Sequence, residues 1–80
     1  MNTVIFTGWN DGLKKISLTS LLRDKAGLSL TQAKLNVDAI VNGVIVEVNC
    51  TTITKMESLV KEATKLGAIC KISKKNLVKA

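Results

Sequence analysis

Histidine is missing from this 80-residue chain, which also has no tyrosine, one phenylalanine, one tryptophan and two cysteines. Without histidine there is no cysteine–histidine pair and no ordinary zinc site, so we expect neither a metal nor a cofactor. The scarcity of aromatic residues means that the core must be aliphatic. Cys50 and Cys70 are too few for a disulfide framework, and we interpret them as small, partly buried apolar residues, although a bridge between them stays open.

Long apolar runs are also missing, since no stretch approaches the roughly 20 residues that a membrane-spanning helix needs. The first residues lack the charged and then apolar layout of a secretion signal. We therefore expect a cytoplasmic protein that enters no membrane. The six carboxylates show no paired arrangement, and the chain has no glycine-rich phosphate loop and no nucleophile with a visible base. The sequence thus predicts a protein that is not an enzyme.

Positive charge is in excess, with twelve Lys and Arg residues against six Asp and Glu residues and a formal net charge of +6. Such a charge attracts anionic partners, whether acidic proteins, RNA or a membrane surface. One basic surface for RNA or an acidic protein could form from Lys61, Lys65, Lys71, Lys74, Lys75 and Lys79. No aromatic residues are interleaved with these lysines, so any contact with RNA would be unspecific.

Three strands are predicted from runs of β-branched and alternating residues. The first covers residues 3–7, with Val4 and Phe6 on one face and Ile5 on the other, and turn residues follow over 8–12. The other two strands are expected over 44–49 and 68–73. In the second strand one face is expected to carry Val44, Val46 and Val48.

Three helices are predicted from apolar residues that recur every three or four positions. The first covers about 14–26, and the second covers 30–41 and ends at Asn42-Gly43. We expect the second helix to bury Leu30, Ala33, Val37 and Ile40. A Thr54–Glu57 capping box is expected to begin the third helix, which ends at Gly67.

The resulting order of elements is β-α-α-β-α-β. It predicts an α+β fold of two layers, with three helices on one face of a small, mainly antiparallel three-stranded sheet. This domain is expected over residues 1–73. The basic tail over 74–80 is expected to fray.

Residues 27–34, Gly-Leu-Ser-Leu-Thr-Gln-Ala-Lys, predict a tight corner between the first two helices. Gly27 has no Cβ and can end a helix in the left-handed conformation. Ser29 can cap the next helix with Gln32 as its capping-box partner. The segment resembles the GLGLxEAK motif in the C-terminal domain of the bacterial ribosomal stalk protein. Leu66-Gly67-Ala68 and the alternating residues that follow are similar to the closing AGAxVEV of the same family.

This resemblance implies a non-enzymatic protein–protein interaction module. In the family, the hairpin of the first two helices meets translational GTPases, so the implied partner is such a GTPase or another ribosome-associated factor. The positions that match the charged face of the family are Lys15, Arg23 and Lys34. Ile16 matches an apolar neighbour of that face, and Leu28 is expected to add apolar contact.

A second likeness supports an alternative function. The protease adaptor ClpS shares the order of elements and places an Asn-Asp loop after its first strand to hold the free α-amino group of a substrate. Here Asn10 and Asp11 occupy a similar place, next to Trp9, a residue type enriched in binding hot spots. The alternative is therefore a small adaptor or inhibitor, of the ClpS or immunity-protein kind, that reuses the fold.

Overall fold

The computed structural model describes residues 2–73 of the chain. Along the chain the elements are β1 (Asn2–Trp9), α1 (Lys15–Ala26), α2 (Leu30–Val41), β2 (Val46–Cys50), α3 (Ile53–Leu66) and β3 (Ala68–Ile72). The predicted β-α-α-β-α-β order is therefore confirmed. The predicted basic tail, with Lys74, Lys75 and Lys79, lies outside the described residues.

The three strands form an antiparallel sheet in the order β2-β1-β3, so β1 lies in the centre. Ile5 of β1 is opposite Glu47 of β2 on one side and Lys71 of β3 on the other. A β-bulge between Phe6 and Gly8 shifts the pairing with β3. Because of this bulge, β1 continues to Trp9, where the sequence predicted a turn.

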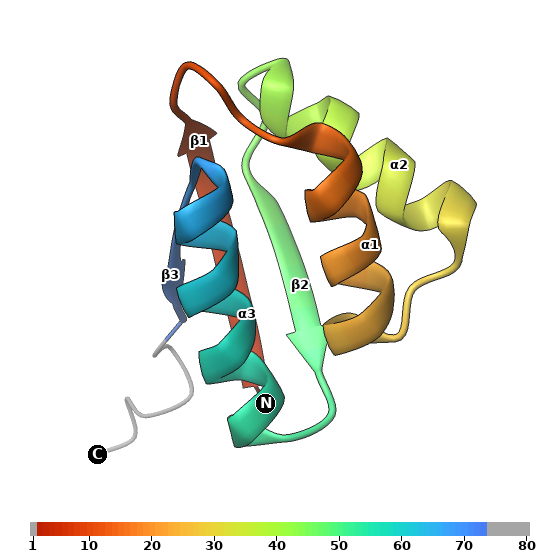
Figure 1. Cartoon of the computed structure of the whole chain (residues 1–80). Helices are drawn as coiled ribbons and strands as arrows, with labels where there is room; N and C mark the ends of the chain where they lie inside the picture. Colours follow the sequence, from red (N-terminus) through yellow and green to blue (C-terminus); the bar gives the residue numbers. More distant parts are fainter. Residues whose placement is uncertain (1, 74–80) are drawn as a thin grey trace.

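All three helices cover one face of the sheet, which confirms the predicted two-layer α+β architecture (Figure 1). Helix α1 contacts both other helices, and α3 lies along β1 and β3. The largest side chains that are fully buried between the layers are Val4, Phe6, Leu18, Leu22, Ile40 and Leu59. The core is aliphatic apart from one phenylalanine, as the composition predicted.

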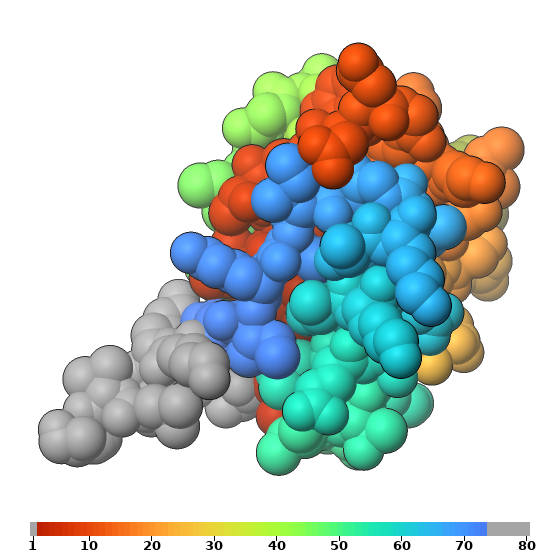
Figure 2. Space-filling model, turned by 60° about the vertical axis from the view of Figure 1, so that its left-hand side comes forward, coloured from red at the N-terminus to blue at the C-terminus, as the bar shows by residue number. Residues whose placement is uncertain are grey.

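Among residues 2–73, no helix covers the opposite face of the sheet, which we call the helix-free face. In Figure 2 the blue atoms of β3 lie at the surface, and red atoms of β1 are visible beside them. The side chains of Thr7, Glu47 and Lys71 are exposed. Since β1 buries Val4 and Phe6 on its other side, the predicted two-sided pattern of this strand is confirmed.

The predicted corner between α1 and α2 is confirmed. Gly27 ends α1 in the left-handed region at φ 68°. The Ser29 hydroxyl accepts a hydrogen bond from the backbone N–H of Gln32 at 3.1 Å, and the Gln32 side chain accepts one from the backbone N–H of Ser29. These groups set the angle at which the chain enters α2.

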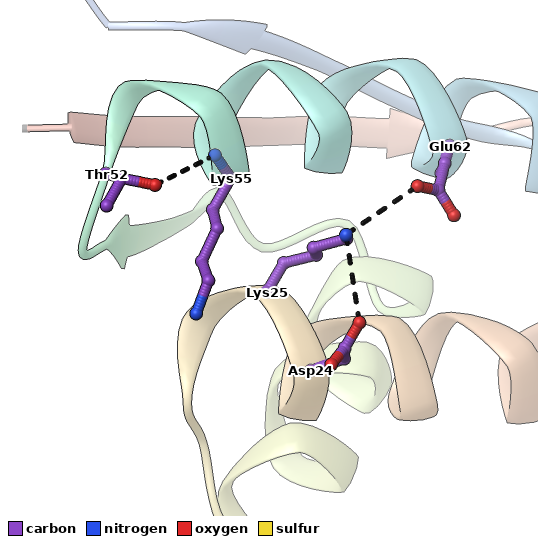
Figure 3. A network of polar contacts seen from close by, with 5 residues as sticks. All are labelled: Asp24, Lys25, Thr52, Lys55 and Glu62. Atoms are coloured by element: carbon purple, nitrogen blue, oxygen red, sulfur yellow. Dashed lines mark hydrogen bonds and ion pairs between the residues drawn. The ribbon is translucent and has the colours of Figure 1, made fainter.

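The start of α3 differs from the prediction. Thr52, and not Thr54, is the N-cap, and its hydroxyl accepts a hydrogen bond from the Lys55 backbone N–H at 3.1 Å (Figure 3). Thr54 is already inside the helix, so the Thr54–Glu57 capping box does not form. Thr52 is extended, at φ −135°, as an N-cap residue must be.

Two apolar residues differ from the prediction, since Leu30 was expected to be buried in the second helix and Val44 was expected to begin the second strand. Leu30 is the first residue of α2 and is 47% exposed. The start of α2 lies away from the sheet (Figure 1). Val44 is 54% exposed and lies before β2. Its backbone N–H donates to the carbonyl oxygen of Ala39 in α2, so this residue still belongs to the turn and not to the sheet.

Within residues 2–73, no helix has the length and the apolar character that crossing a membrane requires.

Candidate protein-interaction site

The hairpin of α1 and α2 brings three of the predicted site residues together. Lys15 and Ile16 of α1 and Lys34 of α2 line one shallow hollow of about 320 Å³. The same hollow is lined by Thr19, Val37 and Asp38. Ile16 is 86% exposed, although it is a large apolar residue. An exposed apolar side chain therefore shares this hollow with two exposed lysines.

The other two predicted residues lie at the far end of the hairpin. Arg23 and Leu28 line a second hollow together with Ser20, Asp24 and Gly27. Arg23 is exposed, whereas Leu28 is half-buried and packs against the core. We refer to these five residues, Lys15, Ile16, Arg23, Leu28 and Lys34, as the hairpin surface.

Regular backbone geometry positions this surface. Lys15 and Arg23 are about two turns apart, so their side chains extend along the same flank of α1. The hydroxyl of Thr19 donates to the carbonyl oxygen of Lys15 at 2.9 Å, within the same stretch of helix. The left-handed Gly27 then folds α2 back beside α1, which carries Lys34 toward Lys15.

The charges of the hairpin surface are available for a partner. No ion pair within residues 2–73 engages Lys15, Arg23 or Lys34. The nearby carboxylate of Asp24 is instead 3.8 Å from the ammonium group of Lys25, which also contacts Glu62 of α3 at 4.0 Å (Figure 3). The Asp38 carboxylate lies in the first hollow and offsets part of the positive charge there.

The alternative site around Asn10 is built largely by backbone contacts. The Asn10 N–H donates to the Gly67 carbonyl oxygen at 2.7 Å, and the Asn10 carbonyl oxygen accepts from the Leu13 N–H at 3.2 Å. The side chains of Asn10 and Asp11 are exposed. The indole N–H of Trp9 donates to the carbonyl oxygen of Val41 at 3.1 Å, so this side chain is fixed against the end of α2.

A groove that the sequence analysis missed lies between α1 and α3, with a volume of about 670 Å³. It is lined by Ser17, Ser20, Leu21, Asp24, Ser58, Lys61, Glu62, Lys65 and Leu66. The groove could not be predicted from either helix alone, because only the packing of α1 on α3 joins the two faces that line it.

Only three lysines of the predicted basic surface, Lys61, Lys65 and Lys71, belong to the described residues, and they do not share one face. Lys61 and Lys65 line the groove on the helix layer. Lys71 is opposite Ile5 in the sheet, and both alternate with residues that face the helices, so Lys71 lies on the helix-free face. The sheet therefore separates the two lysines of α3 from the lysine of β3.

Both cysteines are free thiols, and Cys50 is buried while Cys70 is half-buried. Burial raises the pKa of the Cys50 thiol, and Lys55 lowers it to a smaller extent. Burial also raises the pKa of Cys70, against a weaker effect of its contact with Thr64. Neutral thiols are poor nucleophiles and poor metal ligands. In the described part of the chain, no three Cys, Asp or Glu residues come together as a metal site.

In comparisons with known proteins, no family model and no curated sequence matches this chain.

Proposed function

We propose that this protein is a non-enzymatic interaction module that binds an acidic protein partner through the hairpin surface. The observation that carries the proposal is the hollow shared by Lys15, Ile16 and Lys34. An apolar side chain that is 86% exposed and shares a hollow with two lysines suits a partner that presents an apolar residue together with carboxylates. Arg23 extends the same charge along α1.

The class of partner comes from the resemblance to the ribosomal stalk C-terminal domain. That resemblance points to a cytoplasmic translational GTPase or another ribosome-associated factor. The proposal is supported by the α1–α2 corner, where Gly27 and the Ser29 capping box orient the two helices. It is also supported by the exposure of Lys15, Arg23 and Lys34.

A charge-reversal experiment tests this proposal. The partner is first captured from native cytoplasm by the full chain, with and without nuclease, so that contacts mediated by RNA are separated from protein contacts. Arg23→Glu/Lys34→Glu should then weaken binding at least about tenfold and lower the association rate most at low salt, because steering by charge is screened by ions. The melting temperature should be unchanged, since both side chains are exposed.

A matched control is Lys61→Glu/Lys65→Glu, which makes the same change of net charge on the α1–α3 groove. This control should bind within about threefold of the parent, because charges outside the interface act on the partner only over long, screened distances. If the hairpin variant binds the partner as well as the parent does, the proposal is wrong.

The adaptor alternative makes a different prediction in the same assay. It assigns binding to Asn10 and Asp11, beside the 40% exposed ring of Trp9. In that case Asp11→Asn should abolish capture, and the reversal of Arg23 and Lys34 should do little. A loss of binding in Asp11→Asn alone would favour a small adaptor or inhibitor over the stalk-like module.

A further inference from the structure

The helix-free face of the sheet has a layout that is independent of the hairpin surface. Its central row consists of Glu47, Ile5 and Lys71, which are directly opposite one another on β2, β1 and β3. Both charged side chains are exposed, and Ile5 is half-buried between them. A carboxylate therefore lies on one side of the central strand and an ammonium group on the other.

The neighbouring row toward the bulge is apolar at both ends. Ile69 of β3 is 45% exposed and is opposite Gly8 of β1. A Cβ added to Gly8 would lie 3.6 Å from the Cδ1 atom of Ile69, so the isoleucine side chain lies over this glycine. On the β2 side, Ile45 is 64% exposed and directly precedes Val46, whose side chain is buried against the helices. Ile45 stands one residue before β2 begins, and continuing the alternation of β2 by one residue would place it at the same end of the helix-free face as Ile69.

The row on the other side of Ile5 is polar, and its central residue Thr3 is buried, with 7% exposure. Thr3 is opposite Asn49, and its hydroxyl donates to the side-chain oxygen of Asn49 at 2.7 Å. Along the strands the face thus changes from apolar, through charged, to polar.

We propose that this face binds the same face of a second copy of the chain, around a two-fold axis parallel to β1. Such an axis exchanges the positions of β2 and β3. Glu47 then faces Lys71 of the second copy, Ile45 faces Ile69 of the second copy, and Ile5 meets its own counterpart at the axis. Each row therefore faces a row of matching chemistry, as an isologous interface requires.

The charged row selects this axis over the other one that stacks the two faces. An axis perpendicular to β1 through Ile5 keeps β2 over β2, which would bring Glu47 onto Glu47 and Lys71 onto Lys71. Like charges in contact oppose association. The same axis would also turn the apolar end of one face onto the polar end of the other.

The size of the face predicts a weak dimer. Three strands about 4.8 Å apart and about five residues long give a footprint of roughly 240 Å² per copy. Stable complexes bury about 800 Å² per partner, so this interface belongs with the small, transient class. We expect a dimer that forms and dissociates rapidly and is visible only at high concentration.

Sedimentation of the full chain between about 0.02 and about 2 mM tests the proposal, since weak interfaces assemble in this range. The parent should shift from monomer to dimer. Glu47→Lys and Lys71→Glu should each weaken the dimer at least about tenfold, because two ion pairs become two repulsions. Glu47→Lys/Lys71→Glu restores opposite charges across the axis and should recover the affinity to within about threefold.

The two single variants control for net charge, because one raises the charge of the chain and the other lowers it. If net charge governed association, they would move the affinity in opposite directions. Glu47 also takes part in an interaction within its own chain, so melts of each dilute variant are needed to show that the monomer remains folded. Lys61→Glu, which lies in the α1–α3 groove, should leave the dimer within about threefold of the parent.

A parent chain that stays monomeric over the whole range would overturn the proposal. Single variants that dimerise as well as the parent, or a double variant that does not recover, would overturn it too. Arg23→Glu/Lys34→Glu should dimerise normally, because neither residue is on the sheet. Failure of the proposed function and failure of this dimer can therefore be told apart.

Discussion

The carbonyl oxygen of Gly67 accepts a hydrogen bond from the backbone N–H of Asn10 at 2.7 Å. A second bond of 3.0 Å, from the Lys14 N–H to the Leu66 carbonyl oxygen, lies beside it. Together they hold the loop that follows β1 against the corner where α3 ends and β3 begins. The two segments lie more than fifty residues apart in the sequence, so these two hydrogen bonds connect the beginning of the domain to its end.

Gly67 should be the glycine least tolerant of substitution. Its φ is 106°, and an added Cβ would lie 3.0 Å from the Leu13 Cα atom. Gly27 is also left-handed, at φ 68°, but has open space around that position. We expect Gly27→Ala to cost about 1 kcal/mol and Gly67→Ala at least about 2 kcal/mol, because strain and a backbone clash add. Urea unfolding of both variants measures the difference, and equal costs would contradict it.

Leu59 and Val37 should contribute strongly to stability. Leu59 is fully buried in α3, and Val37 is nearly so in α2. Changing either to Ala removes methyl groups from packed surroundings, which should cost about 2 to 4 kcal/mol of unfolding free energy. Ile16→Ala is the matched control, because its side chain is exposed and should cost less than about 0.5 kcal/mol. Thermal melts in which all three variants behave alike would refute this packing.

The caps of α2 and α3 should be separable by mutation. Ser29→Ala and Thr52→Ala each remove a hydroxyl that accepts a backbone hydrogen bond, so each should cost about 1 kcal/mol. Thr54→Ala should be nearly neutral, because Thr54 lies inside α3 and not at its N-cap. Denaturant unfolding distinguishes the two threonines. A larger loss of unfolding free energy in Thr54→Ala than in Thr52→Ala would indicate that Thr54 is the N-cap, as the sequence predicted.

The two thiols should make stability fall at alkaline pH. Burial raises the pKa of both above the ordinary value of 9.0, so the folded protein holds these protons more tightly than the unfolded chain does. Below the unfolded value both states are protonated and the thiols contribute no pH dependence. As the pH rises through that value, the unfolded chain ionises first and unfolding becomes easier.

The measurement is the unfolding free energy between about pH 8 and about pH 10, where thiols titrate. The parent should lose stability more steeply than Cys50→Ala/Cys70→Ala does. Parallel curves for the two proteins would show that the thiols titrate alike in the folded and unfolded states.

Much of the fold was predictable from local chemistry. The bounds of α2 follow from a capping serine at one end and Asn42-Gly43 at the other, and these signals act within a few residues. The true N-cap of α3 was not predictable in this way, because Thr54, with Glu57 three residues later, is locally the better candidate. Which one becomes extended depends on where β2 ends against β1, and that is a long-range property.

The site was predictable only in part for the same reason. Helical spacing places Lys15 and Arg23 on one flank of α1, and the corner at Gly27 brings Lys34 beside Lys15. The sequence did not reveal the α1–α3 groove, because its two helices are separated in the chain by α2 and β2 and only their packing brings them together. Trp9 was assigned to a turn because it lies among the turn residues 8–12. A bulge in β1, which alternation does not predict, keeps Trp9 in the strand.

The central place of β1 has a consequence for how the chain folds. Thr3 pairs with Asn49, and Val4 pairs with Ile72. The first strand therefore pairs only with segments that are synthesised much later. During synthesis, α1 and α2 can form early because their contacts are local, whereas the sheet must wait until β3 has left the ribosome. Closing such long loops slows folding. Val4 and Phe6 of β1 are then exposed in the nascent chain, and α2, which contacts β1 in the folded protein, is the first element available to cover them.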